Sequence, residues 1–216
     1  MVNGAGSYAD VSGTTNRAVV IFAWTNEGTT TLASVTWNGY TVSATATNSD
    51  AGSTMGWGFS VFTDSQLPGS SKPVTINWTT APGGYNWLAV TVDNVNQSSP
   101  VRTSSAPATQ FGTAPKTTLT GLTVGDLVIG QVTLNTPSRF SSWQNSLVQI
   151  FLAAASGGGQ DIAAAYKTAA SASEVFGTNE TSNDYVFIGA LALAGSGGGG
   201  PTYQPLPYVR PVLLEF

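Results

Sequence analysis

The carboxylates are the main side chains in this chain that could carry chemistry. The sequence contains eleven Asp and Glu residues, but no histidine and no cysteine. Without histidine it lacks the commonest metal ligand and the commonest general base at neutral pH. Without cysteine it can form neither a disulfide nor a thiolate nucleophile. Any catalysis would therefore depend on a pair of carboxylates, as in a glycoside hydrolase.

The acidic residues are spaced singly along the sequence. None belongs to a Glu-x-Asp or Glu-x-Glu pair, which would place two carboxylates on one face of a strand. Most lie beside Gly, Asn or Ser, where an acidic side chain ordinarily closes a turn. We therefore expect no enzymatic activity. The eleven acids include Glu27, Asp50, Asp64, Asp93, Asp126, Asp161, Glu174, Glu180 and Asp184.

One segment could offer oxygen ligands to Ca²⁺. Residues 93–96, Asp-Asn-Val-Asn, carry such ligands at alternating positions. The segment lacks the acidic density and the closing glutamate of a dedicated calcium loop, so we expect an ordinary turn. The glycine runs at 157–159 and 197–200 lack the features that phosphate binding needs. We therefore predict no metal and no cofactor.

The composition argues against charged partners. Charged residues make up 8% of the chain, against about 25% in typical domains. The net charge is −4 and the seven basic residues are scattered, which argues against nucleic-acid binding. No apolar stretch reaches the roughly 18 residues of a membrane span. The first residues have neither a basic nor an apolar signal region, so we expect synthesis in a cytoplasm without export by a standard signal.

Strand patterns cover most of the chain and predict an all-β fold. Residues 17–24 form a continuous apolar run, which is typical of a buried strand. Asn38-Gly39 between alternating runs predicts a type I′ hairpin, because both turn residues need positive φ. An Ala-rich stretch at 161–168 is also interpreted as a strand. Turn signals every 8–12 residues indicate an antiparallel β-sandwich with jelly-roll or Greek-key connections.

The sequence predicts one body with an attached segment. Residues 1–16 form an N-terminal segment, residues 17–194 the β-sandwich body, and residues 195–200 a glycine-rich, flexible linker. A loop-rich stretch at 96–115 divides the strands into two groups. We expect both groups to contribute to one sandwich, because neither group is bounded by a separate linker.

Aromatic residues in the strands are expected to fill the core, where large rings supply much of the buried area. Three aromatics lie at turns or loop ends and are the ones we expect to be exposed: Trp37, Tyr40 and Trp143. Exposed rings of this kind could stack on the faces of sugars. A glycan-binding surface is therefore the alternative to a purely structural role.

Residues 201–216, here called the arm, carry the strongest functional signal. Four prolines forbid a regular helix and favour an extended path. The aromatic and branched residues of the arm are unusual for a disordered segment. We expect the arm not to fold onto the preceding body but to dock on a neighbouring subunit, by adding a strand to an open sheet edge. The predicted contact residues are Tyr203, Tyr208, Val209, Leu213, Leu214 and Phe216.

The order of strands and turns resembles a jelly-roll-like domain of tailed-phage virion proteins. The resemblance is carried by the apolar strand at 18–24, the hairpin at 35–42, the strand at 58–62, the Pro-Gly loop at 67–69, and residues 74–78 and 89–100. It covers about residues 17–194 and implies a virion structural protein assembled in the host cytoplasm. Capsid decoration is the first expectation, and a tail or baseplate accessory or receptor-binding protein is the second. The implied partners are major capsid or tail subunits and copies of the chain itself, and in the second case a host surface glycan.

Overall fold

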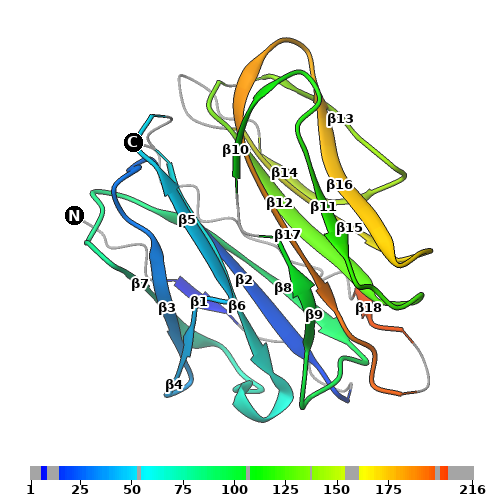
Figure 1. Cartoon of the computed structure of the whole chain (residues 1–216). Coiled ribbons are helices and arrows are strands. Elements are labelled where there is room, and N and C mark those ends of the chain that lie inside the picture. The colour runs from blue at the N-terminus through cyan, green and yellow to red at the C-terminus, as the bar shows by residue number, and fades with distance from the viewer. Residues whose placement is uncertain are drawn as a thin grey trace. The chain divides into compact units, whose positions relative to one another are not determined.

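The computed structural model of the chain describes residues 6–8, 15–52, 55–105, 108–136, 138–153, 161–197 and 200–203. Within these residues it contains strands β1–β18 and a single short 3₁₀ helix, η1 (Asp64–Gln66), and every strand pair between sheet neighbours is antiparallel (Figure 1). The all-β, antiparallel sandwich prediction is therefore confirmed. No helix in the described part of the chain is long and apolar enough to cross a membrane.

The chain divides into two compact units, each with its own pair of sheets. Unit 1 comprises residues 1–100 and 201–216, and unit 2 comprises residues 101–200. This differs from the single body predicted over residues 17–194. The physical reason is that each group of strands supplies two sheets, which bury their apolar faces on each other.

Unit 1 is built from a five-stranded and a four-stranded sheet. The first has the order β18 (Thr202–Tyr203), β8 (Asn86–Asp93), β2 (Ala18–Thr25), β6 (Met55–Thr63) and β5 (Ala46–Asp50). The second has the order β1 (Gly6–Tyr8), β7 (Lys72–Trp78), β3 (Leu32–Trp37) and β4 (Tyr40–Ser43).

Alternation along the strands builds the core of unit 1. Val19, Ile21 and Ala23 of β2 point into the same cluster as Val35 of β3 and Val74 of β7, so the two sheets pack through these side chains. All of β2 is buried, as its continuous apolar run predicts. The predicted hairpin is confirmed at β3–β4: Asn38 has φ 51° and Gly39 has φ 80°, and Trp37 pairs with Tyr40 across the turn.

Unit 2 has a six-stranded and a three-stranded sheet. The larger sheet runs β10 (Ala108–Gly112), β17 (Asp184–Leu193), β12 (Leu127–Leu134), β15 (Asp161–Thr168) and β14 (Val148–Ala153), with β9 (Val101–Ser104) also paired to β17. The smaller sheet runs β11 (Lys116–Thr120), β16 (Ser173–Glu180) and β13 (Phe140–Trp143).

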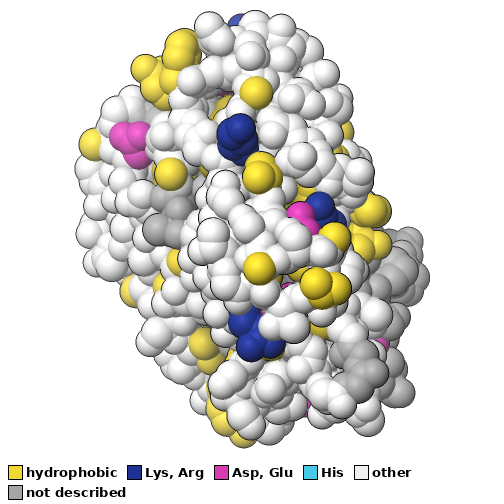
Figure 2. All heavy atoms as spheres, turned by 45° about the vertical axis from the view of Figure 1, so that its right-hand side comes forward, with side chains coloured by type: hydrophobic (Ala, Val, Ile, Leu, Met, Phe, Trp, Pro, Cys, Tyr) yellow, Lys and Arg dark blue, Asp and Glu magenta, His cyan; other side chains and the backbone are white. Residues whose placement is uncertain are grey.

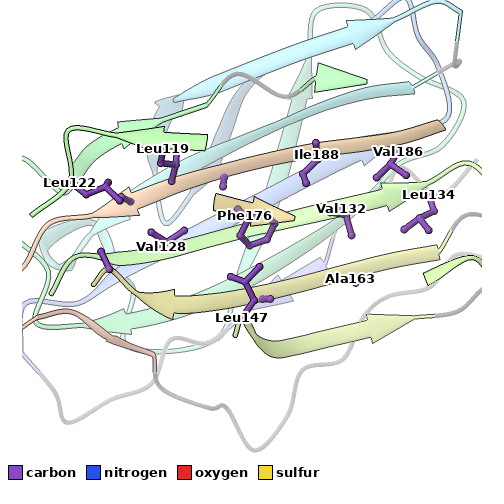
Figure 3. Close-up of a cluster of buried hydrophobic side chains, with 14 residues drawn as sticks. Leu119, Leu122, Val128, Val132, Leu134, Leu147, Ala163, Phe176, Val186 and Ile188 are labelled. Carbon is purple, nitrogen blue, oxygen red and sulfur yellow. The ribbon is translucent and has the colours of Figure 1, made fainter. Parts of the chain in front are cut away.

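A second apolar cluster joins these two sheets. Val132 of β12 and Ile188 of β17 contribute from the larger sheet, and Leu119 of β11 and Phe176 of β16 contribute from the smaller one (Figure 3). The Ala-rich residues 161–168 form a strand, as predicted, and Ala163 and Ala165 belong to this core. Small side chains at these positions let the strand lie close to the opposing sheet.

The stretch predicted as a loop-rich middle, residues 96–115, contains two strands. Both β9 and β10 pair with β17. Their sequences are short and polar, and prolines flank them, so neither strand has a long apolar run of its own. Their pairing depends on β17, which lies far along the chain and is buried at most positions. Local pattern alone therefore favoured a loop.

Candidate functional site: an exposed aromatic pair and a buried carboxyl group

The prediction that Trp37 is exposed is wrong. Its side chain is 0% exposed and belongs to the core of unit 1. Its ring centroid lies 5.6 Å from that of Tyr8 and 5.6 Å from that of Phe62. Alternation explains this, because Trp37 lies two residues after the buried Val35 and therefore points to the same face of β3. Trp37 is not available to bind a sugar.

The other two predicted aromatics differ from each other. Tyr40 is exposed, with 45% of its surface accessible. Trp143 is only partly buried, but it packs against Phe140 and Phe176, with ring centroids 5.2 and 5.5 Å away. Its indole Nε1 donates to Oε1 of Gln149 at 3.2 Å. The three predicted residues therefore do not form one exposed platform.

The structure instead exposes an aromatic pair that the sequence analysis missed. Phe111 on β10 lies directly opposite Tyr185 on β17, and their ring centroids are 4.9 Å apart with the planes tilted by 50°. Their exposed fractions are 62% and 47%. The signal was present as two aromatics in polar contexts, but Phe111 lay in the predicted loop and nothing local linked it to Tyr185.

Hydrogen bonds hold the backbone around this pair. Gln110 binds the main chain of Lys116 twice, accepting from its N–H at 2.9 Å and donating to its carbonyl at 2.5 Å. Asn135 N–H donates to the carbonyl of Tyr185 at 3.0 Å. β10 lies at the edge of its sheet, with β17 as its only sheet neighbour among the described strands. The two rings thus stand on a fixed backbone beside an open strand edge.

The start of the arm pairs with its own chain. Thr202 and Tyr203 form β18 and lie opposite Asp93 and Val92 of β8, and Pro201 is buried. The prediction that the arm does not fold onto the preceding body is therefore wrong for these residues, because the edge of β8 offers them backbone hydrogen bonds. The remaining predicted contact residues lie outside the described residues: Tyr208, Val209, Leu213, Leu214 and Phe216.

Part of the glycine-rich linker is packed. A Cβ atom added to Gly200 would lie 2.2 Å from the carbonyl oxygen of Gly125, so only glycine fits at this approach of two backbones. Gly197 has φ 75°, a conformation that glycine adopts without strain. The sequence predicted only a flexible role for the glycines of the linker. Among the described residues, Gly200 also allows two backbones to pack closely, and Gly197 allows a positive φ.

The acidic residues have structural roles: some close a turn, as the sequence predicted, and others form ion pairs that it did not predict. Asp50 accepts the N–H of Gly52 at 2.8 Å in a turn. Asp64 pairs with Arg17 at 2.7 Å, and Asp126 pairs with Arg102 at 3.1 Å. In the segment at 93–96, Asp93 is buried in β8, while Asn96 accepts the backbone N–H groups of Ser98 and Ser99 in an ordinary turn. Among the described residues, no group of three or more acids could hold a metal ion.

Two glutamates on β16 have opposite environments. Glu174 pairs with Lys167 Nζ at 2.7 Å and accepts the N–H groups of Ala170 and Ser171. Burial alone would raise its pKa, but these donors together hold the pKa of Glu174 below its usual value. Glu180 is 7% exposed, and neither carboxyl oxygen has a hydrogen-bond partner among the described residues.

The environment of Glu180 changes its ionisation. Burial raises the pKa of its carboxyl to about 7, and the charges of Asp184 and Asp161 contribute to the rise. The nearby Thr178 hydroxyl opposes this effect only in part. Glu180 is therefore a buried acid that can change its charge near neutral pH. Sequence analysis treated it as a turn residue, because its neighbours come from other strands.

Comparison of the chain with protein-family models, curated proteins and solved structures finds no match. Three features of the described residues bear on its function: the beginning of the arm at β18, the exposed Phe111–Tyr185 pair, and the buried carboxyl of Glu180.

Proposed function

We propose that the chain is a non-enzymatic structural protein of a tailed-phage virion, most simply a capsid decoration or accessory protein. Residues 204–216 of the arm would dock on a neighbouring virion subunit. The observation that carries this proposal is the pairing of Thr202 and Tyr203 with β8, because it anchors the beginning of the arm on unit 1. The resemblance of the strand and turn order to a jelly-roll-like virion domain gives additional support.

An anchored beginning makes an arm more effective. The residues that follow β18 start from a fixed point, so less conformational freedom is lost when they bind. Their aromatic and branched residues suit the addition of a strand to an open sheet edge, where backbone hydrogen bonds give affinity and side-chain pockets give specificity. Many weak arms acting together on one particle would reinforce each other by multivalency.

The surface is consistent with close packing of many copies. On the face drawn in Figure 2, charged side chains are few and stand in small isolated groups among uncharged atoms. Only 8% of the residues are charged. Copies with such a surface repel each other weakly, so short-range contacts can decide how they pack.

Deletion of residues 204–216 tests the proposal, because it removes the arm but keeps β18. We expect the truncated protein to retain its β-sheet circular dichroism and its unfolding midpoint, and to lose roughly tenfold or more of its occupancy in assembled particles. A full-length Phe216→Asp variant should show a smaller loss. Incorporation of both variants at the level of the unmodified protein would overturn the proposal.

The Phe111–Tyr185 pair favours a second candidate function, a tail or baseplate accessory or receptor-binding protein. Two exposed rings 4.9 Å apart could contact the apolar face of a sugar. Binding to an array of bacterial surface glycans tests this role. Phe111→Ala and Tyr185→Ala should each abolish binding, whereas Tyr40→Ala, an equally exposed aromatic in unit 1, should not. Equal binding by all three variants would exclude this surface.

A further inference from the structure

Two buried aspartates of unit 2 lie close enough for their charges to act on a third buried carboxyl, that of Glu180. Glu180 is at the end of β16, Asp161 at the start of β15, and Asp184 at the start of β17. Their exposed fractions are 7%, 1% and 4%. The charges of Asp161 and Asp184 both act on Glu180. Carboxylates buried this deeply are uncommon unless they are paired.

The two aspartates are satisfied, and they hold the connection between β12 and β13. Asp184 accepts the backbone N–H and the hydroxyl of Thr136, each at 2.9 Å, and the N–H of Tyr185 at 2.8 Å. Asp161 accepts the N–H of Arg139 at 3.2 Å. The carbonyl of Arg139 in turn accepts the N–H of Thr181 at 2.9 Å. These bonds tie one connection to the ends of three strands.

Glu180 differs because its carboxyl has no such partner. It follows Phe176 and Thr178 in the row of β16 side chains that points into the sandwich. Both carboxyl oxygens lack a hydrogen bond among the described residues, as do the Thr178 hydroxyl, which is 0% exposed, and the Ser182 hydroxyl. The Thr178 hydroxyl lies close enough to the Glu180 carboxyl to oppose the rise in its pKa, but the two groups do not form a well-aligned hydrogen bond.

The neighbouring elements supply no ion pair to Glu180. Among the described residues, the charged side chain of β11 is Lys116, which is exposed, and β13 carries no charged side chain. The connection before β13 contributes Arg139, whose backbone N–H binds Asp161. β15 and β17 contribute the carboxylates of Asp161 and Asp184. The described surroundings of Glu180 thus supply negative charge but no ion-pair partner, and a proton on its carboxyl would remove the repulsion from Asp161 and Asp184.

We propose that Glu180 is a proton-operated switch: with a neutral carboxyl, this end of unit 2 is closed, and ionisation places a third negative charge beside Asp161 and Asp184 and opens it. A pKa of about 7 puts this change near neutral pH. The inference is independent of the proposed virion function.

The structure indicates which bonds would open. An ionised, unpartnered carboxylate is strongly disfavoured in the interior, so it must reach water. Glu180 pairs with Phe140, and its N–H donates to the carbonyl of Thr113 at 2.8 Å. Moving the end of β16 outward would disturb both contacts and the Thr181–Arg139 bond. The amides of Thr136, Arg139 and Thr181 should then lose protection from hydrogen exchange.

Hydrogen exchange of the full chain, corrected for the intrinsic effect of pH, tests the switch. Between about pH 6 and pH 8.5 we expect the protection factors of these amides to fall by roughly tenfold in the unmodified protein. In Glu180→Gln, whose side chain stays neutral, they should change by less than about twofold. Glu174→Gln is the matched control on the same strand. In this variant the amides of Thr136, Arg139 and Thr181 should still lose protection as the pH rises, because Glu180 is unchanged.

Two results would overturn the inference. One is an equal loss of protection in the unmodified protein and Glu180→Gln. The other is a pH-independent protection of these amides in the unmodified protein. If Glu180→Gln does not fold, carbon-13 NMR titration of the Glu180 carboxyl in the unmodified protein decides: an apparent pKa near that of an exposed glutamate contradicts the switch.

Discussion

Glu174 and Glu180 both face the interior of unit 2 from strand β16, yet only Glu174 has a cationic partner. Lys167 lies 2.7 Å from the Glu174 carboxylate, whereas both oxygens of Glu180 lack a hydrogen bond among the described residues. The pKa of Glu174 is lowered, and that of Glu180 is raised to about 7. Although both residues are glutamates on one strand, their contributions to the free energy of unfolding should therefore depend on pH in opposite directions.

Glu174→Gln should destabilise the chain at neutral pH by about 2 kcal/mol, because it leaves Lys167 without its partner. A carboxyl whose pKa is lowered on folding stabilises the protein above its unfolded pKa and loses that effect as the pH falls. The difference from the unmodified protein should therefore shrink below the ordinary pKa of 4.5. Urea unfolding of both proteins at several pH values measures this difference in unfolding free energy. A difference that does not change with pH would contradict a stabilising role for the Glu174–Lys167 ion pair.

Glu180→Gln should have the opposite effect. A carboxyl whose pKa is raised on folding stabilises the protein below its unfolded pKa, and the effect is lost as the pH rises from 4.5 to about 7. Above neutral pH the variant should be more stable than the unmodified protein, by up to about 3 kcal/mol. Unfolding free energies from acid to mildly alkaline pH test this, and a variant that still loses stability over that range would exclude Glu180 as the source.

Local sequence predicted the features that local geometry determines. Asn38-Gly39 identified the hairpin because its two positive φ angles are a property of the turn itself. The apolar run of β2 and the strand at 161–168 were also predicted. Features formed by distant residues were not predicted: the rings of Tyr8 and Phe62 pack on Trp37, β17 pairs with residues 101–104 and 108–112, and Glu180 meets acids from two other strands. The division into two units was also not predicted, because it too depends on pairing between strands that are far apart in the sequence.

Replacement of Trp37 should show that this residue is structural. Trp37→Ala removes a fully buried ring, and we expect a loss of about 3–5 kcal/mol in unfolding free energy. Tyr40→Ala, directly opposite on the exposed end of the hairpin, should cost less than about 1 kcal/mol. Chemical denaturation compares the two variants. Similar small losses would mean that Trp37 is not part of the core.

Gly130 should not tolerate even a methyl group. A Cβ atom there would lie 2.6 Å from the carbonyl oxygen of Gly189 and 2.8 Å from both Ala190 Cβ and Phe176 Cζ. Gly130→Ala should therefore cost about 2 kcal/mol or more through overpacking. Gly121→Ala is the control: its surroundings are open, and only its φ of 75° opposes alanine, at about 1 kcal/mol. In thermal unfolding, the midpoint of Gly130→Ala should lie below that of Gly121→Ala. The reverse order of the two midpoints would contradict the tight packing around Gly130.

The aromatic pair of β10 and β17 should interact measurably although it is exposed. Phe111→Ala and Tyr185→Ala each remove one of two rings whose centroids are 4.9 Å apart, so each single replacement loses the same contact. We expect a coupling energy of about 0.5–1.5 kcal/mol from a double-mutant cycle, with the double variant less destabilised than the sum of the single ones. Phe111→Ala with Tyr40→Ala is the control, because Tyr40 belongs to unit 1, and its effects should add. Equal additivity in both cycles would show that the two rings are only neighbours and do not stabilise each other.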